Sequence, residues 1–283
     1  DEAGIDRELL FVDDGSRDKT WAEIQRVSEE NSRVVGVHFS RNFGKEAAMF
    51  AGLEQARGDC VAILDCDLQH PPEKIVEMYR LWEQGYEVIE GVKRSRGNEN
   101  RLYAFAARTF YSLISKATGI DMSRASDFKL LDRKAVDAIL EMPEKKAFFR
   151  ALSGWVGFKS ASVEYDVEER EGGGSRWSTI GLVKYAVSNV ASFSYAPIFA
   201  VAAAGIFTGA VSCFSAIRTA VRRLFGRTVR DGAGLFAWIG FIGAALLISI
   251  GITGYYIAQI YDEVRDRPRY IISDTAGLGD TDR

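Results

Sequence analysis

The chain has 283 residues, of which 47% are hydrophobic, and its formal net charge is -3 at pH 7. This length and apolar content allow a sizeable core, which excludes a disordered or fibrous protein. The lack of a net basic charge argues against a dedicated nucleic-acid-binding protein. Three scattered cysteines and two histidines fit neither a disulfide framework nor a zinc site, so a reducing compartment is expected.

Strand and helix patterns alternate along residues 1–167. Short apolar runs rich in branched residues predict strands at residues 8–12, 34–39, 60–64, 87–92, 128–131 and 162–167. Helical patterns lie between them at residues 18–30, 44–57, 72–84, 101–118 and 133–141. The alternation predicts an α/β domain with a mostly parallel sheet and helices on both faces. Ligands of such sheets bind beyond the carboxyl ends of the strands.

The composition changes after residue 167. Acidic residues and three glycines at 168–175 predict a mobile loop, and residues 179–193 predict an amphipathic helix suited to a membrane surface. Two uncharged segments follow, and each is longer than the roughly 20 residues that a membrane-spanning helix needs. We therefore expect a loop and interfacial helix over 168–196, a transmembrane hairpin over 197–261 and a polar cytoplasmic tail over 262–283, of which residues 273–283 look frayed. Two buried core helices are the alternative, which the lack of a charged face disfavours.

Two acidic motifs follow predicted strands. Asp65 and Asp67 come after the third strand, and their carboxylates, with the amide oxygen of Gln69, can converge on one hard cation such as Mg²⁺ or Mn²⁺. The alternative for this motif is a capped turn before a helix that starts at the following prolines. Asp13 and Asp14 come after the first strand, where they would either cap the next helix or bind a nucleotide.

Five motifs together indicate a family. They are DDGS, RNFGKEAA, DCDLQHPPE, SDFKLLDRKAVDAI and REGGGSRWS, and a predicted two-span hairpin follows them. In this order they resemble the family-2 glycosyltransferases that act on polyprenyl phosphates, and the resemblance covers nearly the whole chain. It implies a GT-A nucleotide-diphospho-sugar transferase domain, followed by the interfacial helix and the hairpin.

The resemblance also implies roles for single residues. Asp127 and Asp67 would be catalytic, Asp127 mainly by orienting the sugar and less by acting as a base. Asp65, Asp67 and Gln69 would hold the metal. The expected nucleotide-sugar contacts are Asp13, Asp14, Lys45, Asp65 and Gln69.

The acceptor phosphate needs cations near the membrane. Arg170 and Arg176 flank a glycine run with Ser175 beside it, directly before the predicted interfacial helix, and Arg176 replaces the lysine usual in relatives. Lys93 and Arg96 form a second candidate cluster, for which a solvated basic turn is an equally good explanation.

The function that the resemblance implies is transfer of a hexose, from a donor such as UDP-glucose, to a polyprenyl phosphate such as undecaprenyl phosphate, with inversion. The implied partners are this donor, the lipid acceptor, the membrane and further copies of the chain in a tetramer. We expect a bacterial plasma-membrane protein with a cytoplasmic catalytic domain. Five arginines between the spans oppose this orientation.

A catalytically impaired scaffold of the same fold is the alternative. Relatives begin with a strand and a Pro-x-Tyr-Asn-Glu loop that helps to clamp the nucleotide base, and no such segment precedes Asp1 in the printed sequence. The resemblance therefore predicts that the first strand of the domain is missing and that one edge of the sheet lacks its neighbour.

Overall fold

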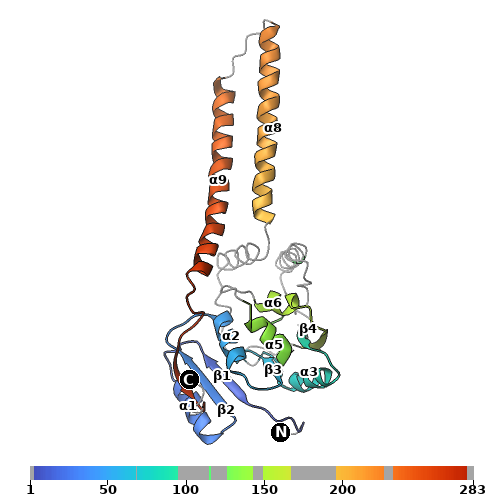
Figure 1. The fold of residues 1–283 in the computed structure, drawn as a ribbon, viewed down its shortest axis with the longest axis vertical. Coiled ribbons are helices and arrows are strands. Elements are labelled where there is room, and N and C mark those ends of the chain that lie inside the picture. The colour runs from blue at the N-terminus through green and yellow to red at the C-terminus, as the bar shows by residue number, and fades with distance from the viewer. Residues whose placement is uncertain are drawn as a thin grey trace. The chain divides into compact units, whose positions relative to one another are not determined.

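The computed structural model describes residues 3–67, 69–94, 115, 126–142, 149–166, 196–225 and 232–278. The chain divides into two compact units, Asp1–Val183 with Arg267–Arg283, and Lys184–Asp266. Figure 1 shows the strands in the first unit and two long helices in the second. The predicted helix at 101–118, apart from residue 115, and the predicted interfacial helix lie outside the described residues.

The first unit contains two β-sheets. The first has the order β1-β2-β7, formed by Leu9–Asp13, Val34–Phe39 and Ile272–Ala276. The second has the order β3-β5-β4-β6, formed by Cys60–Ile63, Lys129–Asp132, Val88–Lys93 and Ser160–Tyr165. All six predicted strands are thus confirmed, each within a few residues of its expected bounds.

The prediction of a mostly parallel sheet is wrong. Only β1 with β2 and β4 with β6 run parallel, whereas β2 with β7, β3 with β5 and β4 with β5 run antiparallel. The prediction assumed that each strand follows its predecessor through a helical crossover, which gives parallel neighbours. Instead β5 lies between β3 and β4 and runs against both, so the domain is α/β with mixed sheets.

The polar tail also differs from its prediction. The sequence predicts fraying over residues 273–283, but Ile272–Ala276 forms β7 and pairs antiparallel with β2. Asp274 accepts hydrogen bonds from Trp21 Nε1 at 3.0 Å and Gln25 Nε2 at 3.2 Å, and Tyr270 stacks on Phe39 with 4.9 Å between ring centroids. The strand covers an edge of β2 that would otherwise expose unpaired backbone groups. The opposite edge of the sheet is β1, which pairs only with β2 among the described strands.

Helices pack on both sheets. They are α1 (Thr20–Glu30), α2 (Lys45–Gln55), α3 (Glu73–Glu83), α5 (Arg133–Leu140) and α6 (Phe149–Trp155). One core cluster joins α3 to the second sheet through Met78, Ile89, Phe128, Leu130, Val163 and Tyr165, each at most 2% exposed. Burying each large apolar side chain contributes about 1.5–3 kcal/mol, so this cluster fixes α3 against the strands. The end of β3 pairs with the start of β5, so the loop that follows β3 and the residues that precede β5 lie at the same end of this sheet.

The second unit is a pair of long helices. They are α8 (Ala196–Leu224) and α9 (Gly232–Val264), which contact each other (Figure 1). Within them Val201–Thr219 and Trp238–Val264 are long and apolar enough to cross a membrane. None of these residues is buried against the rest of the protein, unlike the core helix of a soluble domain. The two helices are therefore candidate membrane spans by length and composition.

Candidate active site

The loop after β1 is held by the side chain of Asp13. This carboxylate is only 4% exposed. Its Oδ1 accepts the Ser16 N–H at 3.1 Å, and its Oδ2 lies 2.7 Å from His38 Nδ1 on β2. Both oxygens of Asp13 therefore have partners within the protein, and the observed contacts are those of a turn-forming aspartate.

Asp14 joins the same loop to the start of α2. Its Oδ1 accepts the Phe43 N–H at 2.6 Å, and its Oδ2 accepts the Gly44 N–H at 2.9 Å. Gly15 has a φ of +68°, and a Cβ there would lie 2.5 Å from the Arg41 backbone, so the turn requires glycine. Because Gly44 precedes α2, Asp14 orients the helix that begins with the predicted donor-binding lysine.

The loop after β3 gathers three possible metal ligands. Asp65, Asp67 and His70 each offer one ligand atom, and these atoms all lie within 4.8 Å of one another. The Gln69 N–H donates to Asp67 Oδ1 at 3.2 Å, which forms a tight turn before α3. The structure thus brings together the two aspartates that the sequence predicts, and the role of the Gln69 side chain stays a prediction.

His70 is a site residue that the sequence analysis missed. Its ring is 8% exposed and packs against Phe128 and Tyr165, with centroids 4.9 and 5.5 Å away. Its Nδ1 is buried and has no hydrogen-bond partner in the part of the chain that the structure describes. Burial lowers the pKa of His70, which favours the neutral imidazole that binds metals. An imidazole and two carboxylates whose ligand atoms lie this close together fit a divalent cation, and imidazole suits Mn²⁺ better than the strictly oxygen-seeking Mg²⁺.

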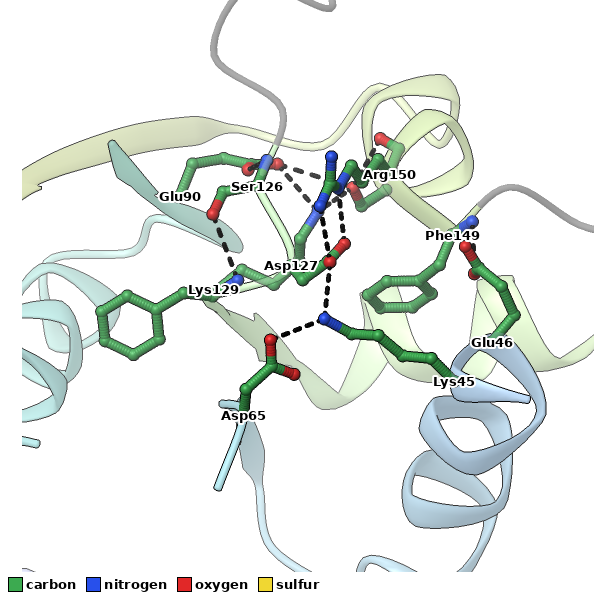
Figure 2. A network of polar contacts seen from close by, with 11 residues as sticks. Lys45, Glu46, Asp65, Glu90, Ser126, Asp127, Lys129, Phe149 and Arg150 are labelled. Atoms are coloured by element: carbon green, nitrogen blue, oxygen red, sulfur yellow. Dashed lines mark hydrogen bonds and ion pairs between the residues drawn. The ribbon is translucent and has the colours of Figure 1, made fainter. Parts of the chain in front are cut away.

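Four charged side chains form a chain of ion pairs beside these ligands (Figure 2). Lys45 Nζ lies 2.6 Å from Asp65 Oδ2 and 2.8 Å from Asp127 Oδ2. Arg150 donates to both oxygens of Asp127, from Nε and from Nη2, at 2.6 Å each. The contributing segments are the start of α2, the end of β3, the residue pair before β5 and the start of α6. The structure therefore joins the predicted residues Lys45, Asp65 and Asp127, and it adds Arg150.

These contacts decide the protonation state of Asp127. Burial alone would raise its pKa, but the bidentate Arg150 and the ammonium of Lys45 outweigh burial and hold the pKa well below its usual range. For Lys45, burial would lower the pKa, but Asp127 and Asp65 outweigh it and the pKa is raised. Near neutral pH, therefore, Asp127 is a carboxylate and a weak base. The geometry favours its orienting role over general-base catalysis.

Glu46 follows Lys45 on α2 and connects this helix to α6. Its Oε2 accepts the Phe149 N–H at 3.0 Å (Figure 2). Burial raises the pKa of Glu46 to about 7, and the nearby negative charge of Asp127 adds to the effect. The pKa values of these two neighbouring acids therefore shift in opposite directions. Asp127 has cationic partners, whereas Glu46 accepts only a backbone N–H among its recorded hydrogen bonds.

A buried lysine supports α6 from the other side. Lys129 on β5 is fully buried, lies 3.0 Å from Glu90 Oε1 and also donates to Ser153 Oγ on α6. Burial lowers the pKa of Lys129, and Glu90 opposes that shift. A buried ammonium needs such partners, so the pair ties α6 to β4 and β5. The helix that carries Arg150 is thereby held in place.

The predicted acceptor-phosphate residues are only partly described. Arg170, Ser175, Arg176 and Arg96 lie outside the described residues. Lys93 ends β4 and is close enough to His70 for its charge to lower the pKa of that imidazole further. Binding of the acceptor phosphate stays a prediction for all five residues, Lys93 included.

Comparisons with known proteins identify the family of this chain. The sequence pattern described as glycosyl transferase family 2 matches residues 3–140. A Synechocystis protein named an uncharacterized glycosyltransferase is 36% identical over 279 residues, which cover 97% of this chain and 87% of that protein. A bactoprenol glucosyl transferase from Shigella flexneri is 36% identical over 94% of this chain and 86% of its own.

A solved structure was also found to be similar. Glucosyl-3-phosphoglycerate synthase from Mycobacterium tuberculosis aligns with a TM-score of 0.43 and 20% identity, over 66% of this chain and 67% of that one. The family assignment rests instead on the relatives that are similar over nearly their whole length. The chain belongs to glycosyl transferase family 2 and is a glycosyltransferase with a GT-A-like fold.

Proposed function

We propose that this glycosyltransferase transfers a hexose from a nucleotide-sugar, UDP-glucose, to a polyprenyl phosphate, undecaprenyl phosphate, with inversion at the anomeric carbon. The observation that carries the proposal is the convergence of Asp65, Asp67 and the His70 imidazole, whose ligand atoms all lie within 4.8 Å of one another. Such a ligand set suits a divalent cation, Mg²⁺ or Mn²⁺, that accompanies a diphosphate. The relatives named bactoprenol glucosyl transferases support glucose as the sugar and a polyprenyl acceptor.

The proposed chemistry needs positioning more than proton transfer. A phosphomonoester acceptor is largely ionised near neutral pH, because its second pKa is about 6, and it is a nucleophile without a base. Asp127, held as a carboxylate by Arg150 and Lys45, would orient the sugar for in-line attack by the acceptor oxygen. When bound, the metal ion would neutralise charge on the departing nucleoside diphosphate.

Donor binding is assigned to the loops after β1 and β3. Both oxygens of Asp14 accept backbone N–H groups, and each keeps a second lone pair with which it would accept from the nucleoside. Asp13 is almost fully buried and its oxygens accept from Ser16 and pair with His38, so it would act on the donor through the loop that it holds. Lys45 would contact the diphosphate, and Gln69 stays a candidate ligand of the metal.

The acceptor and the membrane are assigned to the C-terminal half. Arg170, Ser175 and Arg176 would bind the lipid phosphate, with Lys93 and Arg96 as a second cationic group. We propose the division already expected: a catalytic domain over 1–167, a loop and interfacial helix over 168–196 and a transmembrane hairpin over 197–261. Within the tail over 262–283, Ile272–Ala276 returns to the catalytic domain as β7. By the same resemblance we propose a bacterial plasma-membrane location, with the catalytic domain in the cytoplasm, and assembly into a homo-oligomer.

Turnover with defined substrates tests the proposal. The full chain in detergent is given radiolabelled UDP-glucose and undecaprenyl phosphate, with dolichyl phosphate, GDP-mannose and EDTA as parallel conditions. We expect a glucolipid product, dependent on a divalent cation and preferring undecaprenyl phosphate. Equal turnover in excess EDTA would contradict the metal site, and no product from any donor with either lipid would contradict the proposed acceptor class.

A further inference from the structure

The ammonium of Lys45 forms an ion pair with Asp65, whose carboxylate the proposed metal site needs. The ammonium lies 2.6 Å from Asp65 Oδ2, while Asp65 also belongs to the group of three possible metal ligands. The Lys45 side chain is 47% exposed and that of Asp65 is 36% exposed. An exposed lysine on a four-carbon stem can move without disturbing the core. The contact is therefore one that a competing cation can break.

We propose that Lys45 is a built-in counter-ion of the metal site. In the donor-free protein its ammonium takes the place of a divalent cation at Asp65. When the cation and the nucleoside diphosphate bind together, the ammonium leaves Asp65, keeps its contact with Asp127 and pairs with a diphosphate oxygen. This inference rests on the proposed function, because it assigns Asp65 to the metal.

The charges explain why the ammonium and the cation compete. An ammonium and a divalent cation sharing one carboxylate repel each other, and the repulsion is strong in a partly buried site. Asp127 differs from Asp65, because Arg150 donates to both of its oxygens and Asp127 is not assigned as a ligand of the metal. The Lys45 ammonium can therefore move from Asp65 to the diphosphate while it keeps its contact with Asp127. Figure 2 shows this ammonium between the two aspartates.

The backbone of Lys45 is already in place for such a movement. Asp14 binds the N–H groups of Phe43 and Gly44 immediately before it, and Glu46 immediately after it binds the Phe149 N–H. Only the side chain needs to rotate. The consequence is coupling: the metal binds weakly alone, the diphosphate strengthens metal binding, and the metal strengthens diphosphate binding by the same factor.

Mn²⁺ binding measures this coupling without any turnover. The full chain in detergent is titrated with Mn²⁺, with and without UDP or GDP, and free Mn²⁺ is followed by electron paramagnetic resonance. Lys45→Met removes the ammonium with little change in length, and Lys45→Arg keeps the positive charge. Lys19→Met, at an exposed position before α1, is the matched control for loss of one lysine.

We expect Lys45→Met to bind Mn²⁺ at least about fivefold more tightly than wild type when no nucleotide is present, a modest factor because solvent screens the half-exposed lysine. The strengthening of Mn²⁺ binding by the nucleotide should be about tenfold smaller in Lys45→Met than in wild type. Lys45→Arg and Lys19→Met should behave as wild type does, and all variants should melt within a few degrees of it.

Two results overturn the proposal, and they are distinguishable. If wild type binds Mn²⁺ but Lys45→Met binds it no more tightly without nucleotide, the counter-ion role is wrong and the proposed metal site stands. If neither wild type nor any variant binds Mn²⁺ in either condition, the metal site itself is wrong and the counter-ion role falls with it.

Discussion

Strands β1 and β3 each have two aspartates at or just after their carboxyl end, and the two pairs differ in their contacts in the folded protein. After β1, the oxygens of Asp13 and Asp14 accept from Ser16, Phe43 and Gly44 or pair with His38. After β3, ligand atoms of Asp65, Asp67 and His70 lie within 4.8 Å of one another, and Asp65 is paired with the half-exposed Lys45. The first end builds a loop, and the second is arranged for a ligand. An acidic pair after a strand is therefore evidence for a site only once its hydrogen bonds are known.

Substituting one aspartate at each end tests this difference, and the larger effect is expected at the second end. Asp67→Asn keeps the size of the side chain and removes its charge. We expect the rate of glycosyl transfer to fall about 10³-fold, because the residue is assigned to the metal, while the melting temperature changes little. Steady-state transfer assays across a Mn²⁺ series measure it. Transfer at the wild-type rate would place the divalent cation elsewhere.

Glu46 lies between the two ends and extends the comparison to pH. Its pKa is raised to about 7 from an ordinary value of 4.5. The stability that it contributes is fully present below pH 4.5 and is lost as the pH rises through 7. Relative to Glu46→Gln, the free energy of unfolding of wild type should fall by up to about 3 kcal/mol between these values and stay level above them.

Urea unfolding of both proteins at several pH values measures this difference. Glu46→Gln is a fitting reference because its amide oxygen can still accept the Phe149 N–H. A constant difference between the two proteins from pH 4.5 to 8 would show that Glu46 is ionised throughout and that its burial has little effect on its pKa.

The smallest effect is expected for Asp14→Ala, at the first end. The substitution removes the acceptor of the Phe43 and Gly44 N–H groups, which should cost about 1–3 kcal/mol of stability. Because Lys45 follows Gly44, donor affinity should also weaken, whereas Mn²⁺ binding should remain. Thermal melting and calorimetric titration with UDP-glucose check the two parts. Asp14→Asn is the control, since it keeps one acceptor oxygen, and an unchanged melting temperature would remove Asp14 from the loop's support.

Much of the local structure could be predicted from the sequence. The six strands of residues 8–167, the helices α1, α2, α3 and α5 and the acidic strand ends follow from patterns within about a dozen residues, and the two long apolar helices follow from longer uncharged runs. The same holds for Asp65 and Asp67, which lie two positions apart. Such patterns record whether a segment is half-buried or spans a long apolar distance, and those properties are local. The short helix that carries Arg150, α6, was not predicted from the sequence.

The tertiary structure decided what long-range pairing controls. Arg150 meets Asp127, and Lys45 meets Asp65, across 23 and 20 positions of chain, and no spacing rule relates them. His70 was passed over because its significance lies in a buried nitrogen without a partner, which only packing against Phe128 and Tyr165 reveals.

The direction of β5 and the return of Ile272–Ala276 to β2 were likewise decided by the fold. A strand's own residues record that one face is buried, and they do not record which edge it joins or in which direction it runs. The edge that a strand joins and its direction depend on which strand offers unpaired backbone groups, and that depends on the arrangement of the other strands.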